Sequence, residues 1–160
     1  MPHHIALALF DFLKVFDWNK LAIAYNLKIP SSRKLIQEIR NLQSIRNEEQ
    51  KDFNIEITLE YGFELNRDKN SSGVFENFLE KIKETNSKII FFDGTLTDYN
   101  SLMSALERNN SWEELFDASH IWILSPGLLS HAELSKSSEI LDFSMNEKRF
   151  PGMFVYNKKM

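Results

Sequence analysis

The chain has 160 residues, a formal net charge of −4 and no cysteine. This length suits a single domain with a full core, and the absence of thiols excludes disulfides, cysteine nucleophiles and cysteine zinc sites. Mixed charges give no electrostatic reason to bind nucleic acid, and no segment has the ~18–20 apolar residues that cross a membrane. The apolar residues 5–10 are few and follow no Lys or Arg, so we expect neither a signal peptide nor an anchor.

The first fifty residues predict three helices. Apolar residues at helical spacing predict the first over residues 4–16, and Asp17 can cap a second that carries Leu21 and Tyr25. Pro30 ends this second helix, because proline disfavours helical backbone at the residue before it. A third helix, capped by Ser31 or Ser32, would present an apolar stripe made of Leu35, Ile39, Leu42 and Ile45.

Residues 54–66 give the clearest strand pattern in the chain, because apolar and polar side chains alternate throughout. Such alternation predicts one face on the core and one in water, and therefore a position toward the edge of a sheet. The segment is longer than most strands, so we expect a bulge or bend, with Gly62 as its site. The solvent-facing side of this strand would carry an acidic strip formed by Glu56, Glu60 and Glu64.

A further amphipathic helix, with Phe75 and Phe78 on its apolar side, leads to the stretch that we expect to organise the fold. Residues 89–92 are consecutively apolar, β-branched then aromatic, which predicts a short strand buried on both faces. The next residues provide a turn and then side-chain oxygens that can cap a helix over residues 98–109 (Asp93, Gly94, Thr95, Thr97 and Asp98). A buried strand, a polar turn and a helix start form the usual ligand position of an α/β fold.

Residues 121–124 repeat the pattern of a fully buried strand, and weaker strands are expected at residues 139–143 and 153–156, toward the sheet edges. Strands that alternate with helices predict a largely parallel sheet. We therefore predict a single α/β (or α+β) domain over residues 1–160. Residues 1–50 would form an N-terminal helical layer, and residues 53–160 a mixed, mainly parallel sheet with a β-α-β-α-β core.

Residues 92–98, Phe-Asp-Gly-Thr-Leu-Thr-Asp, resemble the second half of the first motif of haloacid-dehalogenase-type phosphatases, which reads Asp-x-Asp-Gly-Thr after a buried strand. In that family the first Asp is the nucleophile, and Phe91 stands in its place here. Without that carboxylate, the covalent phospho-aspartate and half of the magnesium site are missing. The pattern therefore favours a turn at Asp93 and Gly94, followed by a helix cap at Thr95.

A second alternative is nucleic-acid binding through the basic helix over residues 31–47. From Leu21 to this helix, the spacing of apolar residues partly matches that of a helix-turn-helix, and Arg33 and Arg40 lie on the basic face. However, Pro30 replaces the usual glycine-type turn and acidic residues dilute the basic face, so a solvated amphipathic helix is the better interpretation.

Other sequence motifs that would indicate a metal site, a phosphate site or a catalytic nucleophile are absent. No histidine pairs with a carboxylate at metal-ligand spacing, and there is neither a glycine-rich phosphate loop nor a nucleophile motif. We therefore expect no catalytic residue, metal or cofactor. Trp112 precedes two glutamates, an arrangement that suits contact with a basic protein, although packing of this ring on the sheet is the favoured alternative.

These observations lead to a functional hypothesis. We expect a cytoplasmic, non-enzymatic, protein-binding domain of immunity, inhibitor or regulatory type, which acts through an acidic, aromatic surface on a basic protein partner. We expect no nucleic-acid or membrane partner. The alternatives are a small-ligand-binding or enzymatic domain that uses residues 89–98, and nucleic-acid binding through residues 31–47.

Overall fold

The structure is a computed structural model, and it describes residues 2–49, 54–64, 72–85, 87–109, 120–124 and 154–156. These residues form four helices and one five-stranded sheet with the strand order β2-β1-β3-β4-β5. The helices are α1 (Pro2–Val15), α2 (Pro30–Glu49), α3 (Ser72–Glu84) and α4 (Leu96–Arg108). The strands are β1 (Lys20–Asn26), β2 (Glu56–Phe63), β3 (Ile89–Asp93), β4 (Ile121–Leu124) and β5 (Phe154–Tyr156).

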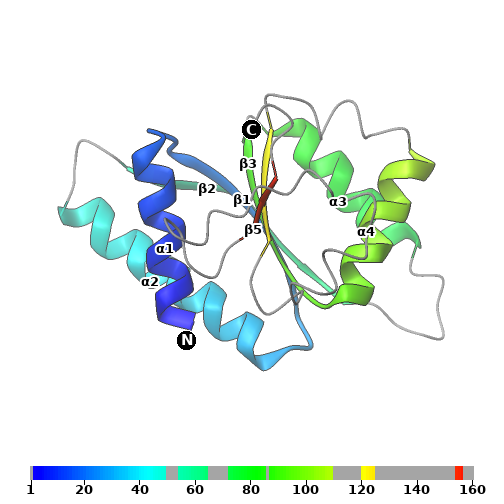
Figure 1. Ribbon diagram of the computed structural model, residues 1–160, viewed down its shortest axis with the longest axis horizontal. Helices are drawn as coiled ribbons and strands as arrows, with labels where there is room; N and C mark the ends of the chain where they lie inside the picture. Colours follow the sequence, from blue (N-terminus) through cyan, green and yellow to red (C-terminus); the bar gives the residue numbers. More distant parts are fainter. Residues whose placement is uncertain are drawn as a thin grey trace.

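The sheet lies between two layers of helices (Figure 1). Helices α1 and α2 pack on one face, and α3 and α4 pack on the other. Strands β1 to β4 are parallel, and β5 pairs with β4 in the antiparallel direction. The predicted α/β class, with helices on a mixed and mainly parallel sheet, is confirmed. No helix among the described residues is long and apolar enough to cross a membrane.

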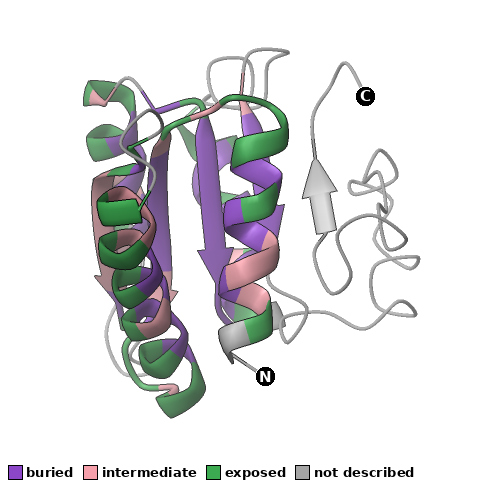
Figure 2. Cartoon of the chain, turned by 90° about the vertical axis from the view of Figure 1, so that its left-hand side faces the viewer, coloured by how far each residue is buried: buried purple, intermediate pink, exposed green. Residues whose placement is uncertain are grey.

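The two predicted central strands are confirmed. Every residue of β3 and β4 is buried, because successive side chains enter opposite helical layers. Ile89 and Phe91 pack with α1 and α2, whereas Ile90 and Phe92 pack with α3 and α4. Figure 2 shows buried residues along the central strands behind α1 and α2, mostly intermediate exposure along the edge strand β2, and exposed residues on the outer sides of the two helices.

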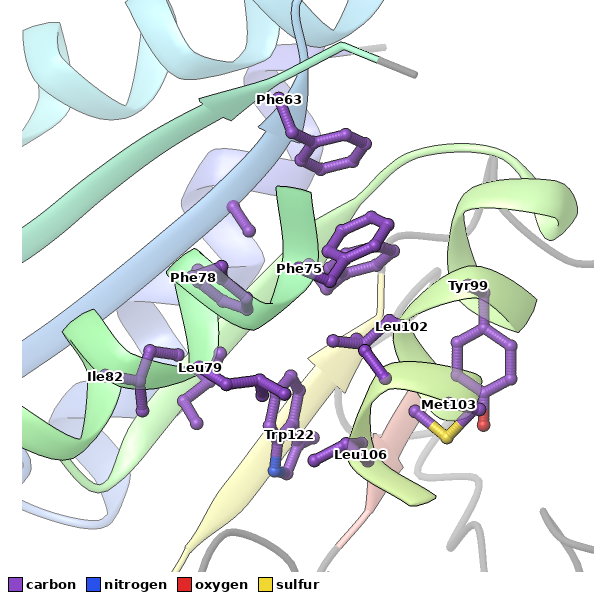
Figure 3. Close-up of a cluster of buried hydrophobic side chains, with 14 of the residues drawn as sticks. Phe63, Phe75, Phe78, Leu79, Ile82, Tyr99, Leu102, Met103, Leu106 and Trp122 are labelled. Atoms are coloured by element: carbon purple, nitrogen blue, oxygen red, sulfur yellow. The ribbon is translucent and has the colours of Figure 1, made fainter. Parts of the chain in front are cut away.

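Aromatic rings fill the layer between the sheet and helices α3 and α4 (Figure 3). Phe63 of β2 stacks on Phe92 of β3 with ring centroids 5.4 Å apart, and it meets Phe75 of α3 at 5.0 Å. Phe78 meets the edge of Trp122 at 6.5 Å. Each such pair adds about 0.5–1.5 kcal/mol beyond the area that it buries, so this layer is a main source of stability.

The main correction concerns residues 17–26, where the sequence pattern predicted a second helix. They contain β1, which lies between β2 and β3 at the centre of the sheet. The spacing of Leu21 and Tyr25 and the high helix propensity of alanine favoured a helix, but short apolar runs are ambiguous. Burial of Leu21 against one helical layer and of Ala22 against the other makes the segment a strand. Residues 1–50 are therefore not a purely helical layer.

Strand β2 lies at an edge of the sheet, as predicted, but its irregularity is not at Gly62. The adjacent β1 residues Leu21 and Ala22 pair with Ile57 and Leu59, which leaves Thr58 as the extra residue. A one-residue insertion moves the following side chains to the opposite face of a strand. Apolar side chains before the bulge pack toward α1 and α2, and those after it pack toward α3 and α4 (before: Ile55, Ile57; after: Leu59, Tyr61, Phe63).

Two side-chain hydrogen bonds join β2 to neighbouring elements, one at the bulge and one farther along the strand. The Thr58 hydroxyl donates to the Leu21 carbonyl oxygen at 3.2 Å. Farther along the strand, the Tyr61 hydroxyl donates to the Val74 carbonyl oxygen at 2.6 Å, and burial raises the pKa of this phenol.

The predicted strand at residues 139–143 lies outside the described residues, whereas β5 confirms the one at residues 153–156.

Candidate functional site

The carboxyl ends of β1 and β3 lie side by side at the centre of the sheet. The chain leaves β1 through α2 on one face and leaves β3 through α4 on the other face. This divergence is a topological switch point, where ligands of open α/β sheets bind. The structure brings the predicted residues Asp93, Thr95 and Asp98 to this edge, directly after β3.

Asp98 is the most enclosed of these residues, with 3% of its surface exposed. Thr95 is the N-cap of α4, and its hydroxyl accepts from the Asp98 backbone N–H at 3.1 Å. In return, Asp98 Oδ2 accepts from the Thr95 backbone N–H at 2.8 Å. The two residues form a capping box, which satisfies donors that the helix itself leaves unpaired. The predicted helix cap at Thr95 is confirmed.

Asn26, at the end of β1, joins this network from the neighbouring strand. Its side-chain amide donates to Asp98 Oδ2 at 2.7 Å, and its Oδ1 accepts from the Lys28 backbone N–H at 2.9 Å. Asn26 therefore ties the loop after β1 to the start of α4. The sequence analysis missed this residue because it placed the preceding residues in a helix. A polar residue directly after the apolar run of residues 21–24 is the signal that could have found it.

The backbone of Gly94 is packed closely against Asp98. A Cβ at Gly94 would lie 2.7 Å from Asp98 Oδ2 and 3.1 Å from the Phe63 ring, so only glycine fits without movement. Asp93 is also buried, at 8% exposed. Phe91, in the place of the phosphatase nucleophile, is fully buried among α1 and α2. Within the described part of the chain, no three acidic or histidine side chains are grouped to hold a metal.

The three glutamates of the predicted acidic strip do not share one face. Strand pairing puts Glu60 on the face covered by α1 and α2, and the bulge at Thr58 puts Glu56 on the opposite face. Glu60 forms an ion pair with Arg40 of α2, and Glu64 forms one with Lys28 at 3.3 Å. The expected single acidic strip is therefore wrong, because the bulge separates these carboxylates and basic side chains pair with two of them. Trp112 lies outside the described residues.

The basic face of α2 is also engaged within the molecule. Arg33 donates to the Leu27 carbonyl oxygen at 2.6 Å, Arg40 pairs with Glu60, and Arg46 pairs with Asp11 at 3.1 Å. Because residues 20–26 form a strand, α2 has no preceding helix of a helix-turn-helix, so that geometry is wrong for this chain.

The amino edge of the sheet, opposite to Asp98, holds a pocket that the sequence analysis did not predict. The pocket encloses about 140 Å³. Its lining comes from the link between α1 and β1 and from the start of β3 (Asp17, Trp18, Asn19, Lys20, Lys88, Ile89). Each lysine directly precedes an apolar run in the sequence, but their proximity could not be inferred while β1 was interpreted as a helix.

The turn that carries this pocket is held in a defined conformation. The Trp18 N–H donates to the Leu13 carbonyl oxygen at 2.9 Å, and the Asp17 N–H donates to that of Lys14 at 3.1 Å. These two bonds form a Schellman motif, and Asp17 occupies its left-handed position with φ 55°. Glycine usually takes this position, because a side chain there is strained.

Aromatic side chains lie next to the pocket. Phe16 stacks on Trp18 with ring centroids 4.9 Å apart and an interplanar angle of 14°, and Phe12 supports both rings from α1. Phe16 is 36% exposed, and the preceding Val15 is 50% exposed. The amino edge therefore combines an apolar surface, two lysines and a small pocket.

Comparison with known proteins gives no relative from which a site could be transferred: no protein-family model matches the chain, and no curated protein matches it.

Proposed function

We propose that this chain is a cytoplasmic, non-enzymatic protein-binding domain, of immunity, inhibitor or regulatory type, and that its partner docks at the amino edge of the sheet. The observation that carries the proposal is the exposed pair Val15 and Phe16, with Phe16 stacked on Trp18. Aromatic side chains are enriched in protein interfaces, where they bury a large area at a small entropic cost. Single exposed apolar residues are common, but adjacent ones backed by a second ring form a docking surface.

The geometry of the carboxyl edge supports the non-enzymatic part of the proposal. A catalytic carboxylate needs an oxygen that can reach a substrate. Asp98 Oδ2 instead accepts from Asn26 and Thr95, and it lies so close to Gly94 that a Cβ there would be 2.7 Å away. A small-ligand or enzymatic site at residues 89–98 is therefore the weaker alternative. Nucleic-acid binding through residues 31–47 is weaker still, because Arg40 and Arg46 already pair with acidic residues.

The test compares three baits in a lysate of the source organism, with bound proteins identified by mass spectrometry. The baits are the unaltered protein, Phe16→Ser and Ile45→Ser. Ile45, on α2, is 48% exposed and serves as the matched control, since its replacement removes a similar exposed apolar surface elsewhere.

We expect at least one protein to be retained by the unaltered chain and by Ile45→Ser and to be lost with Phe16→Ser. Losing one central aromatic anchor typically weakens an interface by about 2 kcal/mol, or roughly thirtyfold in affinity. Capture of the same proteins by all three baits, or of none by the unaltered chain, would contradict docking at Phe16.

A further inference from the structure

Two lysines stand next to each other at the amino edge of the sheet. Leu21 of β1 pairs with Ile89 of β3, and Lys20 and Lys88 are the residues that directly precede this pair. Parallel strands lie about 4.8 Å apart, so these neighbouring positions bring two positive charges to the same level. Both residues line the same pocket.

The two lysines of this pocket lack a close ionic partner among the described residues. The described ion pairs of the chain involve other basic residues, and neither Lys20 nor Lys88 has an ion-pair partner among the residues that the structure describes. Asp17 also lines the pocket and Glu56 of β2 pairs with Lys20 in the sheet, so two acidic residues lie near the two lysines, although neither forms a described ion pair with them. Neighbouring like charges repel, and a bound anion would relieve that repulsion.

The size of the pocket limits what it can hold. Pockets for whole small molecules usually measure about 300–1,000 Å³, whereas this one encloses about 140 Å³. It therefore suits one anionic group that belongs to a larger molecule. The stacked rings of Phe16 and Trp18 beside it can cover an apolar group on the same molecule.

We propose that the pocket receives a side-chain carboxylate of the protein partner, so that the partner presents an acidic residue next to an aromatic one. This inference rests on the proposed function, and it gives the partner an acidic docking segment in place of the basic surface that the sequence suggested. Lys20 and Lys88 would pair with the carboxylate, and the exposed side of Phe16 would meet the neighbouring ring.

The test uses a peptide probe and amide-detected nuclear magnetic resonance on the full chain. Acetyl-Phe-Glu-Glu-amide is titrated against its uncharged match, acetyl-Phe-Gln-Gln-amide, and inorganic phosphate is titrated separately. We expect the acidic peptide to shift the Trp18 indole signal and the amide signals of residues 17–20 and 88–89, and the uncharged peptide to bind at least about fivefold more weakly.

Two charge changes of opposite sign separate a binding role from a structural one. We expect Lys88→Gln to weaken binding of the acidic peptide about fivefold and Asp17→Asn to strengthen it about twofold to threefold, since the first removes a positive charge and the second a negative one. Asparagine also tolerates the left-handed backbone at position 17, so this variant keeps the turn. Lys34→Gln, on an exposed residue of α2, is the matched control and should change nothing.

Several outcomes would overturn the carboxylate assignment. They are equal binding of the two peptides, loss of binding with Asp17→Asn, signal changes at another surface, or binding of phosphate alone. The two proposals can fail separately. If Phe16→Ser abolishes lysate capture while the acidic peptide does not bind, the result supports protein docking at Phe16 and contradicts carboxylate binding in the pocket. If the peptide binds as expected but no lysate protein depends on Phe16, the pocket stands and the proposed docking function falls.

Discussion

At the carboxyl edge of the sheet, the Asp98 carboxylate is 3% exposed and accepts hydrogen bonds from Asn26 and Thr95. At the amino edge, Lys20 and Lys88 line a pocket, and neither has an ion-pair partner among the described residues. A buried carboxylate that accepts two hydrogen bonds stabilises the fold, whereas neighbouring ammonium groups that form no ion pair with a described residue do not. Polar side chains at the usual ligand edge of an α/β sheet thus hold the structure together here, and those at the opposite edge line the pocket that we propose for the partner.

The largest effect should follow from changing Asp98. In Asp98→Ala, the buried Asn26 amide and the Thr95 N–H lose their acceptor, and α4 loses its capping box. An unsatisfied buried donor and a lost cap together predict a decrease of about 3 kcal/mol in the free energy of unfolding. Urea denaturation followed by circular dichroism measures it, and the midpoint should fall without a change in slope.

The matched control is Glu107→Ala, which changes an exposed acidic residue on the same helix and should alter stability by less than about 0.5 kcal/mol. Asp98→Asn should lie between the two variants, because the amide keeps one acceptor oxygen but loses the charge near the helix N-terminus. If Asp98→Ala is as stable as Glu107→Ala, the carboxyl edge is not a structural network, and its carboxylate becomes a candidate for ligand binding.

Gly94→Ala should give the next largest effect, because it adds one methyl group at the most crowded point of the same edge. The new Cβ would lie 2.7 Å from Asp98 Oδ2 and 3.1 Å from Phe63. Overpacking of a filled site costs about 1–3 kcal/mol, and we expect about 2 kcal/mol by urea denaturation.

Gly73→Ala is the control for this prediction, since nothing lies within 4 Å of the added atom on α3. It should leave stability unchanged or raise it by up to about 1 kcal/mol through helix propensity. A Gly94→Ala protein that matches Gly73→Ala in stability would mean that the carboxyl edge has room to open, and the contrast between the two edges would weaken.

The carboxyl edge was largely predictable from the sequence, and the amino edge was not. Residues 89–92 form a short run of β-branched and aromatic residues, which favours a buried strand over a helix, and Thr95 and Asp98 have capping-box spacing. These local rules act within a few residues, so they identify α4 and its cap. Asn26 is absent from that prediction because its partner Asp98 lies 72 residues away, across a strand pairing that local patterns do not reveal.

Strand β1 shows why the rest could not be predicted. A central strand beside large rings needs small side chains, and Ala22 and Ala24 provide the space that Phe63, Phe75 and Phe92 fill. The same alanines favour a helix when the sequence is considered without its surroundings. Misplacing β1 also hid the switch point and the meeting of Lys20 with Lys88. Likewise, no feature of the alternating pattern in residues 54–66 shows that Thr58 is a bulge.

At the amino edge, Asp17→Gly should raise stability. Asp17 has φ 55°, a conformation that strains a residue with a side chain and that glycine adopts freely. We expect a gain of up to about 1 kcal/mol, measured as a higher melting temperature, while Asp17→Asn should stay close to the original protein. An unchanged or lower melting temperature for Asp17→Gly would show that the Asp17 side chain stabilises the turn by an amount that offsets the backbone strain.

The smallest effect, Lys88→Gln, tests the contrast most directly because its sign differs from that of the Asp98 variants. Removing one of two neighbouring positive charges should raise the free energy of unfolding by about 0.3 kcal/mol at low salt, an amount limited by solvent screening at this exposed position. The gain should vanish in 1 M sodium chloride, where the screening length falls to about 3 Å. Differential scanning calorimetry at both salt concentrations measures this gain.

A variant that gains stability while losing affinity for the acidic peptide would mean that Lys88 serves binding at a cost to the stability of the fold. A variant that loses stability at low salt would mean that Lys88 has a favourable ionic interaction within the folded chain, and both edges would then be structural.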